Sequence, residues 1–355
     1  MKQSLLPKTF AGISAPLLLL FASLAIAAPG NGAEANATNS TVVPIQQKPG
    51  DLLGGFKRAV CYSGFRHGQH PDRGDGAVNP SDKEILEDLQ LLSRQGNFAL
   101  IRLYDAQANS EAVLRLIETN KLNLKVMLGA WLAAEVSNPN CPWHKEPYPK
   151  EVLEANKLKN AREIENAIHL ANQYSNTVVA VAVGNEALVD WNDHLVPVDS
   201  VISYVRKVKK SISQPVTVAE NYNWWAHQGA ALAKELDFVS VHTYPAWEGK
   251  DIDEAMPFSI ANLQAVRNAL PHSQLVITEA GWATAASEFG PRANEQKQKR
   301  YYHDLFAWAD QMNITTFFFE AFDEDWKGDP NNPLGAEKHW GLFTVDREPK
   351  QVVRR

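Results

Sequence analysis

Short apolar runs alternate with amphipathic stretches along the chain from residue 53 onward. Each run is four to six residues long and rich in β-branched side chains, as is typical of buried strands. The runs predict eight strands, at Arg58–Tyr62, Ala99–Leu103, Lys125–Leu128, Val178–Val183, Pro215–Ala219, Phe238–His242, Gln274–Thr278 and Thr315–Phe319. Apolar residues at helical spacing predict helices between them, at Ser81–Gln95, Ser110–Asn120, Leu153–Tyr174, Val198–Ser211, Ala230–Leu236, Ser259–Leu270 and Asn294–Gln311.

Eight strands that alternate with helices are the element count of a (β/α)8 TIM barrel. No linker-like break follows residue 49, which favours a single α/β domain. The competing interpretation is an open doubly wound sheet, which would carry a Gly-rich phosphate-binding turn after its first strand. The stretch Cys61-Tyr-Ser-Gly-Phe65 has no such pattern. The sequence therefore predicts a barrel.

The first 28 residues are typical of a secretory signal peptide. Lys2 and Lys8 precede an apolar stretch that ends in Ala25-Ile-Ala27. We expect export to the periplasm or out of the cell, with an uncleaved membrane anchor as the alternative. Residues 29–52 are rich in Ala, Asn, Thr and Gly and predict a flexible linker. Residues 53–355 are then the barrel domain.

The composition of the chain excludes some classes of binding partner and cofactor. A net charge of −6 and a pI near 6.0 argue against nucleic acid, because phosphate contacts need clustered Lys and Arg. No Cys-x-x-Cys or His-Glu-x-x-His pattern occurs, so we expect neither a metal nor another cofactor. The two cysteines, Cys61 and Cys141, fit a disulfide and two buried thiols equally well. After signal cleavage we expect a monomer without stable membrane insertion.

Polar and aromatic residues gather where the predicted strands end, which is where a barrel builds its site. Glu186 follows one strand and Glu279 another, and they can face each other if these strands are parallel neighbours. Two carboxylates across one cleft are the equipment of glycoside hydrolysis. The other candidates at strand exits are Arg102, Tyr104, Asn185, Tyr244, Trp282, Glu320, Asp323 and Trp326. Such a ring suits a neutral polyhydroxyl chain.

Five motifs in order resemble glycoside hydrolase family 17, the β-1,3-glucanases and glucanosyltransferases, and in particular its bacterial and fungal-wall branches. They are Ile101-Arg-Leu-Tyr-Asp105, Val183-Gly-Asn-Glu186, Thr278-Glu-Ala-Gly-Trp282, Phe322-Asp-Glu-Asp-Trp-Lys327 and Glu337-Lys-His-Trp-Gly-Leu-Phe343. The resemblance implies a (β/α)8 barrel and retention of configuration. It also implies Glu186 as the acid/base and Glu279 as the nucleophile.

The resemblance and the residue chemistry suggest further roles. Asn185 resembles the family's donor to the sugar 2-hydroxyl, and Arg102 is expected to keep the nucleophile ionised. The sugar-stacking candidates are Tyr104, Tyr244, Trp282 and Trp326, and the hydroxyl-binding candidates are Glu320 and Asp323. The charged positions shared with the family, Glu324, Lys327 and Glu337, fit a supporting network. His242 is interpreted as a barrel histidine, because a two-carboxylate mechanism requires no third proton carrier.

Three functions compete. The leading hypothesis is a retaining hydrolase of β-1,3-glucan. The second is a transglycosylase with the same catalytic pair, for which Trp191 and Trp224 are possible acceptor sites. The third is a non-catalytic glucan-binding protein. A long first loop, Tyr62-Ser-Gly-Phe-Arg-His-Gly-Gln-His-Pro71, can block one end of a groove, which keeps exo action and glucanosyl transfer open.

Overall fold

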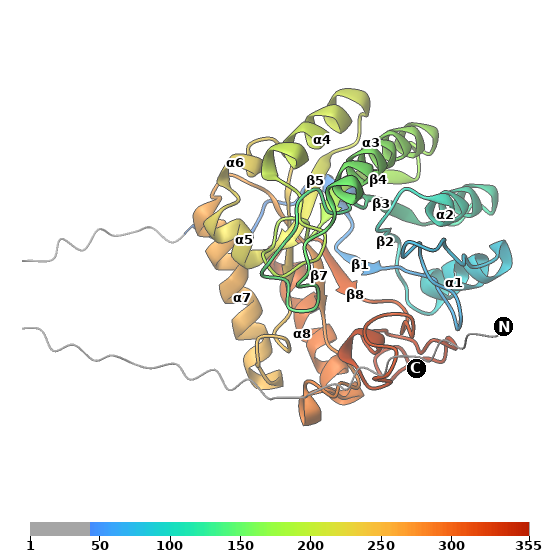
Figure 1. Cartoon of the computed structure of the whole chain (residues 1–355). Helices are drawn as coiled ribbons and strands as arrows, with labels where there is room; N and C mark the ends of the chain where they lie inside the picture. Colours follow the sequence, from blue (N-terminus) through green and yellow to red (C-terminus); the bar gives the residue numbers. More distant parts are fainter. Residues whose placement is uncertain (1–42, 355) are drawn as a thin grey trace, which may run out of the picture. The chain divides into compact units, whose positions relative to one another are not determined.

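Eight parallel strands close into one barrel, and helices surround it (Figure 1). The computed structural model describes residues 43–354. The strands are β1 Arg58–Cys61, β2 Leu100–Arg102, β3 Lys125–Ala130, β4 Val178–Asn185, β5 Val216–Asn221, β6 Val239–Thr243, β7 Leu275–Gly281 and β8 Thr316–Phe319. Each strand pairs with its sequence neighbours, and β8 closes the ring on β1. This confirms the predicted (β/α)8 fold.

The helices follow the strands in the order that the pattern predicts. They are α1 Asp82–Arg94, α2 Ala108–Thr119, α3 Lys150–Gln173, α4 Val198–Ser211, α5 Tyr222–His227, α6 Ala230–Ala233, α7 Ile252–Ala269 and α8 Glu295–Met312. Short 3-10 turns occur at Leu52–Gly55, Gly290–Arg292 and Ala336–Lys338. A capping box begins α1, with Ser81 and Glu84 each accepting from the other's backbone N–H.

Two helices differ from the sequence prediction. Helix α7 begins seven residues before the predicted start, because a capping box of Asp251 and Glu254 starts it and Pro257 lies within it. Proline lacks the N–H that a helix interior requires, so a sequence pattern containing Pro257 predicts that the helix starts after it. The short α5, which Asn221 caps, has too few residues to show a helical period.

The barrel wall is buried on both sides, as is usual for parallel sheets. All seven residues of β7 are buried, including the polar Thr278 and Glu279. Cys61 and Cys141 are both buried and unlinked, and the Cys61 thiol donates to the Thr278 carbonyl at 3.3 Å. The question that cysteine spacing left open is thereby decided in favour of two buried thiols.

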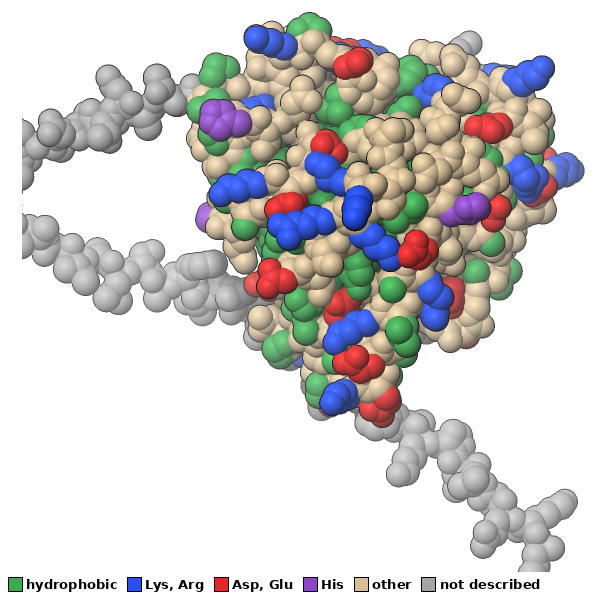
Figure 2. Space-filling model, turned by 90° about the horizontal axis from the view of Figure 1, so that it is seen from above, with side chains coloured by type: hydrophobic (Ala, Val, Ile, Leu, Met, Phe, Trp, Pro, Cys, Tyr) green, Lys and Arg blue, Asp and Glu red, His purple; other side chains and the backbone are tan. Residues whose placement is uncertain are grey.

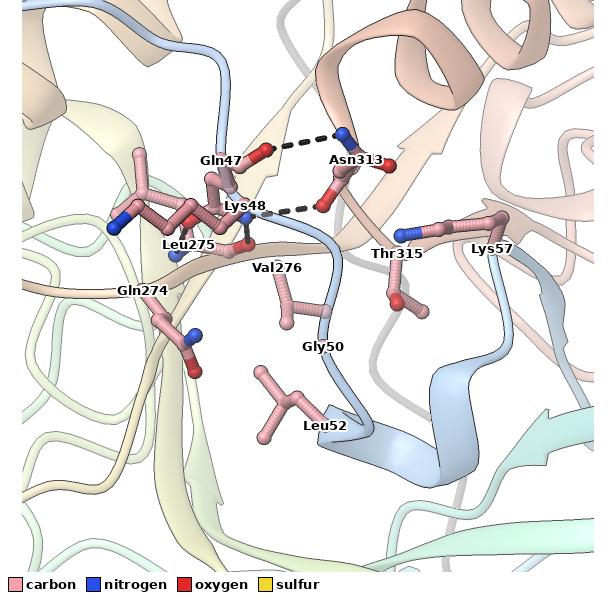
Figure 3. A pocket seen from close by; sticks show the side chains of 10 residues that line it. All are labelled: Gln47, Lys48, Gly50, Leu52, Lys57, Gln274, Leu275, Val276, Asn313 and Thr315. Carbon is pink, nitrogen blue, oxygen red and sulfur yellow. Dashed lines mark hydrogen bonds between the residues drawn. The ribbon is translucent and has the colours of Figure 1, made fainter.

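The segment before β1 packs across the base of the barrel. Gln47 donates from Nε2 to the Leu275 carbonyl at 2.9 Å and accepts from the Leu275 N–H at 2.6 Å. Asn313 donates to the Gln47 carbonyl at 3.0 Å (Figure 3). The packed unit therefore begins near residue 42, and residues 43–52 of the predicted linker belong to it. The rest of that segment and the predicted signal peptide lie outside the described residues.

A small cavity lies beside Gln47 at this base (Figure 3). Its volume of about 20 Å³ suits about one water molecule. It is far too small for a sugar chain, and it lies at the N-terminal ends of the strands. The base therefore contributes to stability, while the opposite end remains for a site.

Basic and acidic side chains are interspersed over the face seen in Figure 2. This face therefore offers no single-sign patch of the kind that nucleic acid binds. Within residues 43–354, no helix has both the length and the apolar character that crossing a bilayer requires.

We predict that Gln47→Ala lowers the free energy of unfolding by about 2 kcal/mol, because it leaves the Leu275 N–H without its acceptor. Denaturant unfolding measures this change. The neighbouring Gln46→Ala is the control, since exposed Gln46 makes one bond, to the Gln311 carbonyl. Equal stability of the two variants would contradict the role given to Gln47.

Candidate active site

The two predicted catalytic glutamates lie at the C-terminal end of the barrel. Glu186 directly follows β4, and Glu279 lies two residues before the end of β7. Strand β7 has an extra residue here, because His242 pairs with Glu279 whereas Val241 pairs with Ile277. Bulges of this kind turn side chains near active sites. This one sets the direction of Glu279.

The backbone turns sharply at the end of β4. Gly184 has φ 82° and Glu186 has φ 46°, a left-handed conformation that is uncommon for a residue with a side chain. The Glu186 N–H donates to the Ala219 carbonyl of β5 at 2.8 Å, which holds the turn. Such strained positions cluster at functional sites. The turn leaves the Glu186 side chain about one quarter exposed at the barrel mouth.

Three side chains hold the buried carboxylate of Glu279. Arg102 of β2 donates to Oε1 at 2.7 Å, and the Tyr104 hydroxyl donates to the same oxygen at 3.1 Å. The Tyr244 hydroxyl donates to Oε2 at 2.5 Å. Both oxygens therefore have donors.

Burial alone would raise the pKa of Glu279. The charges of His242 and Arg102 and the bonds from Tyr244 and Arg102 outweigh it, so this pKa lies below its ordinary value. Burial raises the pKa of Tyr104 and Tyr244 well above 10, so both remain hydroxyl donors. Glu279 is thus kept ionised, as a nucleophile must be.

His242 of β6 lies between the two carboxylates that are predicted to be catalytic. Its Nδ1 is 3.0 Å from Glu186 Oε1 and 3.6 Å from Glu279 Oε2. Those two oxygens are therefore no further apart than the sum of these distances. Inverting glycosidases hold their carboxyl groups about 6.5–9.5 Å apart and retaining ones about 5–5.5 Å. The sum is an upper limit for these two oxygens, so the site admits the shorter, retaining separation.

This arrangement corrects one geometric expectation. Strands β4 and β7 are not neighbours, because β5 and β6 lie between them. The two glutamates instead lie close together because each contacts Nδ1 of His242 in β6. The prediction that His242 is a buried barrel residue is correct in position, but sequence reasoning missed its contact with both carboxylates. One sequence signal could have indicated this contact. His242 and Tyr244 are two residues apart, and residues two apart in a strand point to the same face.

Asn185 lies beside Glu186 and is held by the same arginine. Arg102 Nη2 donates to Asn185 Oδ1 at 2.5 Å. Because Oδ1 accepts from Arg102, the orientation of the amide is fixed and its Nδ2 group can donate to another partner. Asn185 can therefore present a hydrogen-bond donor next to Glu186.

The predicted supporting residues form a buried cluster. Lys327 Nζ lies 2.9 Å from Glu320 Oε2 and 2.5 Å from Glu324 Oε2. Burial opposes the charge of Lys327, but these carboxylates raise its pKa above the usual range. Burial raises the pKa of Glu337, and the charges of Glu279 and Glu186 add to this while Lys327 opposes it. The cluster is thus electrostatically linked to the catalytic pair.

Two predicted sugar contacts, those of Trp282 and Glu320, are wrong because these side chains are buried. Trp282 is fully buried, donates to the Arg292 carbonyl at 2.9 Å and packs on Tyr301, so it cannot stack on a sugar. Glu320 is buried, and both of its oxygens bond Lys327.

Asp323 is also buried, and its Oδ1 accepts from the Gly341 N–H and from Lys350. Tyr104 and Tyr244 hold Glu279 through their hydroxyls, and because both side chains are half-buried rather than buried, their stacking on a sugar stays a prediction. Trp326 remains partly exposed, with its indole N–H donating to Glu324 at 2.8 Å.

Exposed aromatic rings lie elsewhere at the mouth. Trp131 directly follows β3, is 38% exposed and lies 4.6 Å from the His194 ring. Trp247, in the loop after β6, is 45% exposed. Trp224, a predicted acceptor site, is buried and so unavailable. Exposure depends on tertiary packing, which strand position alone does not reveal.

Comparisons with known proteins identify the family of this barrel. A model described as BtgE/BtgC glycoside hydrolase domain matches residues 59–341. A glucan 1,3-beta-glucosidase of Arthroderma benhamiae is 27% identical over 288 residues, which are 75% of this chain and 83% of that protein.

Two solved structures share the fold. An endo-laminarinase from Formosa Hel1_33_131 gives a TM-score of 0.71 at 28% identity, covering 85% of this chain and 86% of that one. An active-site mutant of a Rhizomucor miehei beta-1,3-glucanosyltransferase, in complex with laminaritriose, gives 0.64 at 23% identity, covering 84% and 97%.

We predict that Tyr244→Phe raises the pKa of Glu279, because it removes a donor to the ionised form. Carbon-13 NMR titration of glutamate-labelled protein measures this pKa. The stability that a lowered carboxyl pKa contributes is present above the unfolded-state pKa and is lost as pH falls through the folded-state value. The variant should therefore have a smaller contribution of this kind, and should have lost all of it at a higher pH than the wild type.

Tyr222→Phe is the matched control, since its ring packs against Phe258 and its side chain is likewise half-buried. A Glu279 titration that is the same in both variants would argue against the assigned donor.

Proposed function

The chain belongs to the family of BtgE/BtgC glycoside hydrolase domains, and we propose that it cleaves β-1,3-linked glucan through a two-glutamate, retaining mechanism. The membership confirms the resemblance carried by the sequence motifs. Support for the substrate comes from the glucan 1,3-beta-glucosidase and endo-laminarinase named above. Support for the mechanism comes from one observation, the close approach of Glu186 and Glu279 to a single nitrogen of His242.

The first step places opposite demands on the two glutamates. Glu279 Oε attacks the anomeric carbon, and the bond from that carbon to the leaving oxygen breaks. Glu186 gives its proton to this oxygen, so the departing sugar leaves as a neutral alcohol. Arg102, Tyr104 and Tyr244 orient Glu279 for this attack. Asn185 donates from Nδ2 to the 2-hydroxyl of the same sugar.

The second step returns both glutamates to their starting state. Glu186, now ionised, removes a proton from water as the water oxygen attacks the anomeric carbon. The bond from that carbon to Glu279 breaks, and its carboxylate is again held by Arg102. Two inversions at one carbon give net retention.

A second candidate, glucanosyl transfer, is favoured by the ring of Trp131. Trp131 packs on His194, and His194 Nε2 is 3.0 Å from the Asn185 carbonyl, so this exposed ring lies near the Glu186 side of the mouth. Aromatic faces stack on sugars. A glucan chain resting there would present its hydroxyl to Glu186 in place of water.

We also propose that the protein is exported, because its first residues have the charge and apolar pattern of a signal peptide. Detection of the mature N-terminus in the medium or periplasm tests this, and recovery of the full-length chain in the membrane would contradict it.

We predict that Glu186→Ala and Glu279→Ala each lower kcat on linear β-1,3-gluco-oligosaccharides by at least about 10²-fold, the lower end for loss of an acid–base group. Reaction of each variant with an activated aryl glycoside in the presence of azide distinguishes the acid/base from the nucleophile. Glu186→Ala should yield a β-glycosyl azide, because azide attacks the glycosyl-enzyme. Glu279→Ala should yield the α-azide, because azide attacks the substrate directly.

Glu248→Gln is the control, as this exposed carboxylate follows Trp247 in the loop after β6. It should keep wild-type rates. Mass spectrometry of wild-type products distinguishes hydrolysis, which gives only shorter chains, from transfer, which also gives longer ones. A wild-type protein that binds these chains and changes none of them would be a glucan-binding protein instead.

A further inference from the structure

The loop between β1 and α1, residues 62–80, is a built structure that we call the strap. His70 and Val78 pair in antiparallel fashion, with their N–H groups donating to each other's carbonyls at 3.1 and 2.9 Å. At its tip, Asp72 Oδ1 accepts from the N–H groups of Gly74 and Gly76. The strap therefore has a paired stem and a closed turn.

The stem is fastened to α1. Arg66 donates to the Glu84 carbonyl at 3.1 Å and to buried Asp88 at 3.0 Å. Gln69 donates to the Glu84 carboxylate at 3.2 Å. These bonds fix the direction in which the strap leaves the barrel wall.

The tip joins two parts of the mouth. Arg73 donates to the Trp326 carbonyl at 3.1 Å, in the loop after β8. The adjacent Asp72 lies 3.7 Å from Lys159 of α3. Closer to the stem, Phe65 meets the Trp326 ring edge to face with centroids 6.0 Å apart.

Lys159 lies above the strand ends, not beside the barrel. Glu163, one turn further along α3, accepts from the N–H groups of Ala106 and Trp131, which follow β2 and β3. Through Arg73 and Asp72 the strap links the β8 loop to α3, so it spans the β1 and β2 side of the mouth.

The β8 end of this span lies opposite Glu186 in the barrel. Glu186 follows β4, and in the closed order of eight strands β8 lies four positions from β4. The leaving oxygen must lie next to Glu186, which protonates it. The part of the glucan on the non-reducing side of the cleaved bond therefore extends away from β4, toward β8 and β1.

We propose that the strap closes this end of the groove, so that the enzyme cuts at a fixed, short distance from the non-reducing end of a β-1,3-glucan chain. The proposal rests on the proposed function and adds which bond is cut. The proposal requires that a long chain on the reducing side extends over β4 to β6.

The test uses β-1,3-gluco-oligosaccharides of increasing length that carry a label at the reducing end. Mass spectrometry of the labelled products locates the cut bond. In the wild type, its distance from the non-reducing end should stay constant as the chain lengthens. A shortened strap, with residues 71–77 replaced by Asn-Gly, keeps the His70–Val78 pair on a two-residue hairpin turn. It should raise cleavage at internal bonds by about tenfold.

Arg73→Ala is a second variant that leaves the chain length unchanged, and it should shift the cut bond in the same direction. Asp75→Ala, at an exposed position on the strap, is its control and should cut like the wild type. Variable cut positions in the wild type, or an unchanged cut position in both strap variants, would overturn the proposal.

Absence of any turnover would contradict the proposed function instead. In that case, binding tests the strap. The shortened strap should bind long β-1,3-glucan more tightly than the wild type, because the blocked end of the groove is then open. Equal affinity of the wild type and the shortened form would overturn the proposal in that case.

Discussion

The contact between Arg102 and Glu279 is the interaction on which the rest of the site depends. Both side chains are almost fully buried. Neither charge is tolerated there alone, and breaking such a pair typically costs about 3–5 kcal/mol. Arg102 also donates to the Thr278 carbonyl and to Asn185. One guanidinium from β2 thus fixes groups on β4 and β7, so the barrel and the site depend on the same contact.

This constraint makes the two glutamates unequal. Glu279 has a protein donor for each carboxylate oxygen and little exposure, so its position and ionisation are set before any sugar arrives. Glu186 contacts His242 and is partly open to solvent, so it can meet a leaving oxygen or a water. A double displacement needs one fixed nucleophile and one accessible proton carrier. The asymmetry of burial supports the proposed roles independently of their separation.

Sequence reasoning was successful where the signal is local. Alternating elements identified all eight strands, and strand ends placed Glu186 and Glu279 at the same end of the barrel. It failed where a distant segment decides the outcome. Trp282 follows β7 as a sugar platform would, yet the Arg292 carbonyl and Tyr301 enclose it. Asp323 is occupied by Lys350, 27 residues later. The meeting of non-neighbouring strands at His242 requires the closed barrel and the β7 bulge, which periodicity does not reveal.

Chemistry and substrate length depend on different parts of this molecule. The groups that hold the catalytic pair come from strands β2, β4, β6 and β7 or the residues directly after them, where backbone pairing restricts movement. The strap and the β8 loop are connecting segments, which tolerate change better than strands do. A change in the strap can therefore alter which bond enters the site without moving Arg102 or Glu279. Relatives with one catalytic barrel and different loops can differ in product length for this reason.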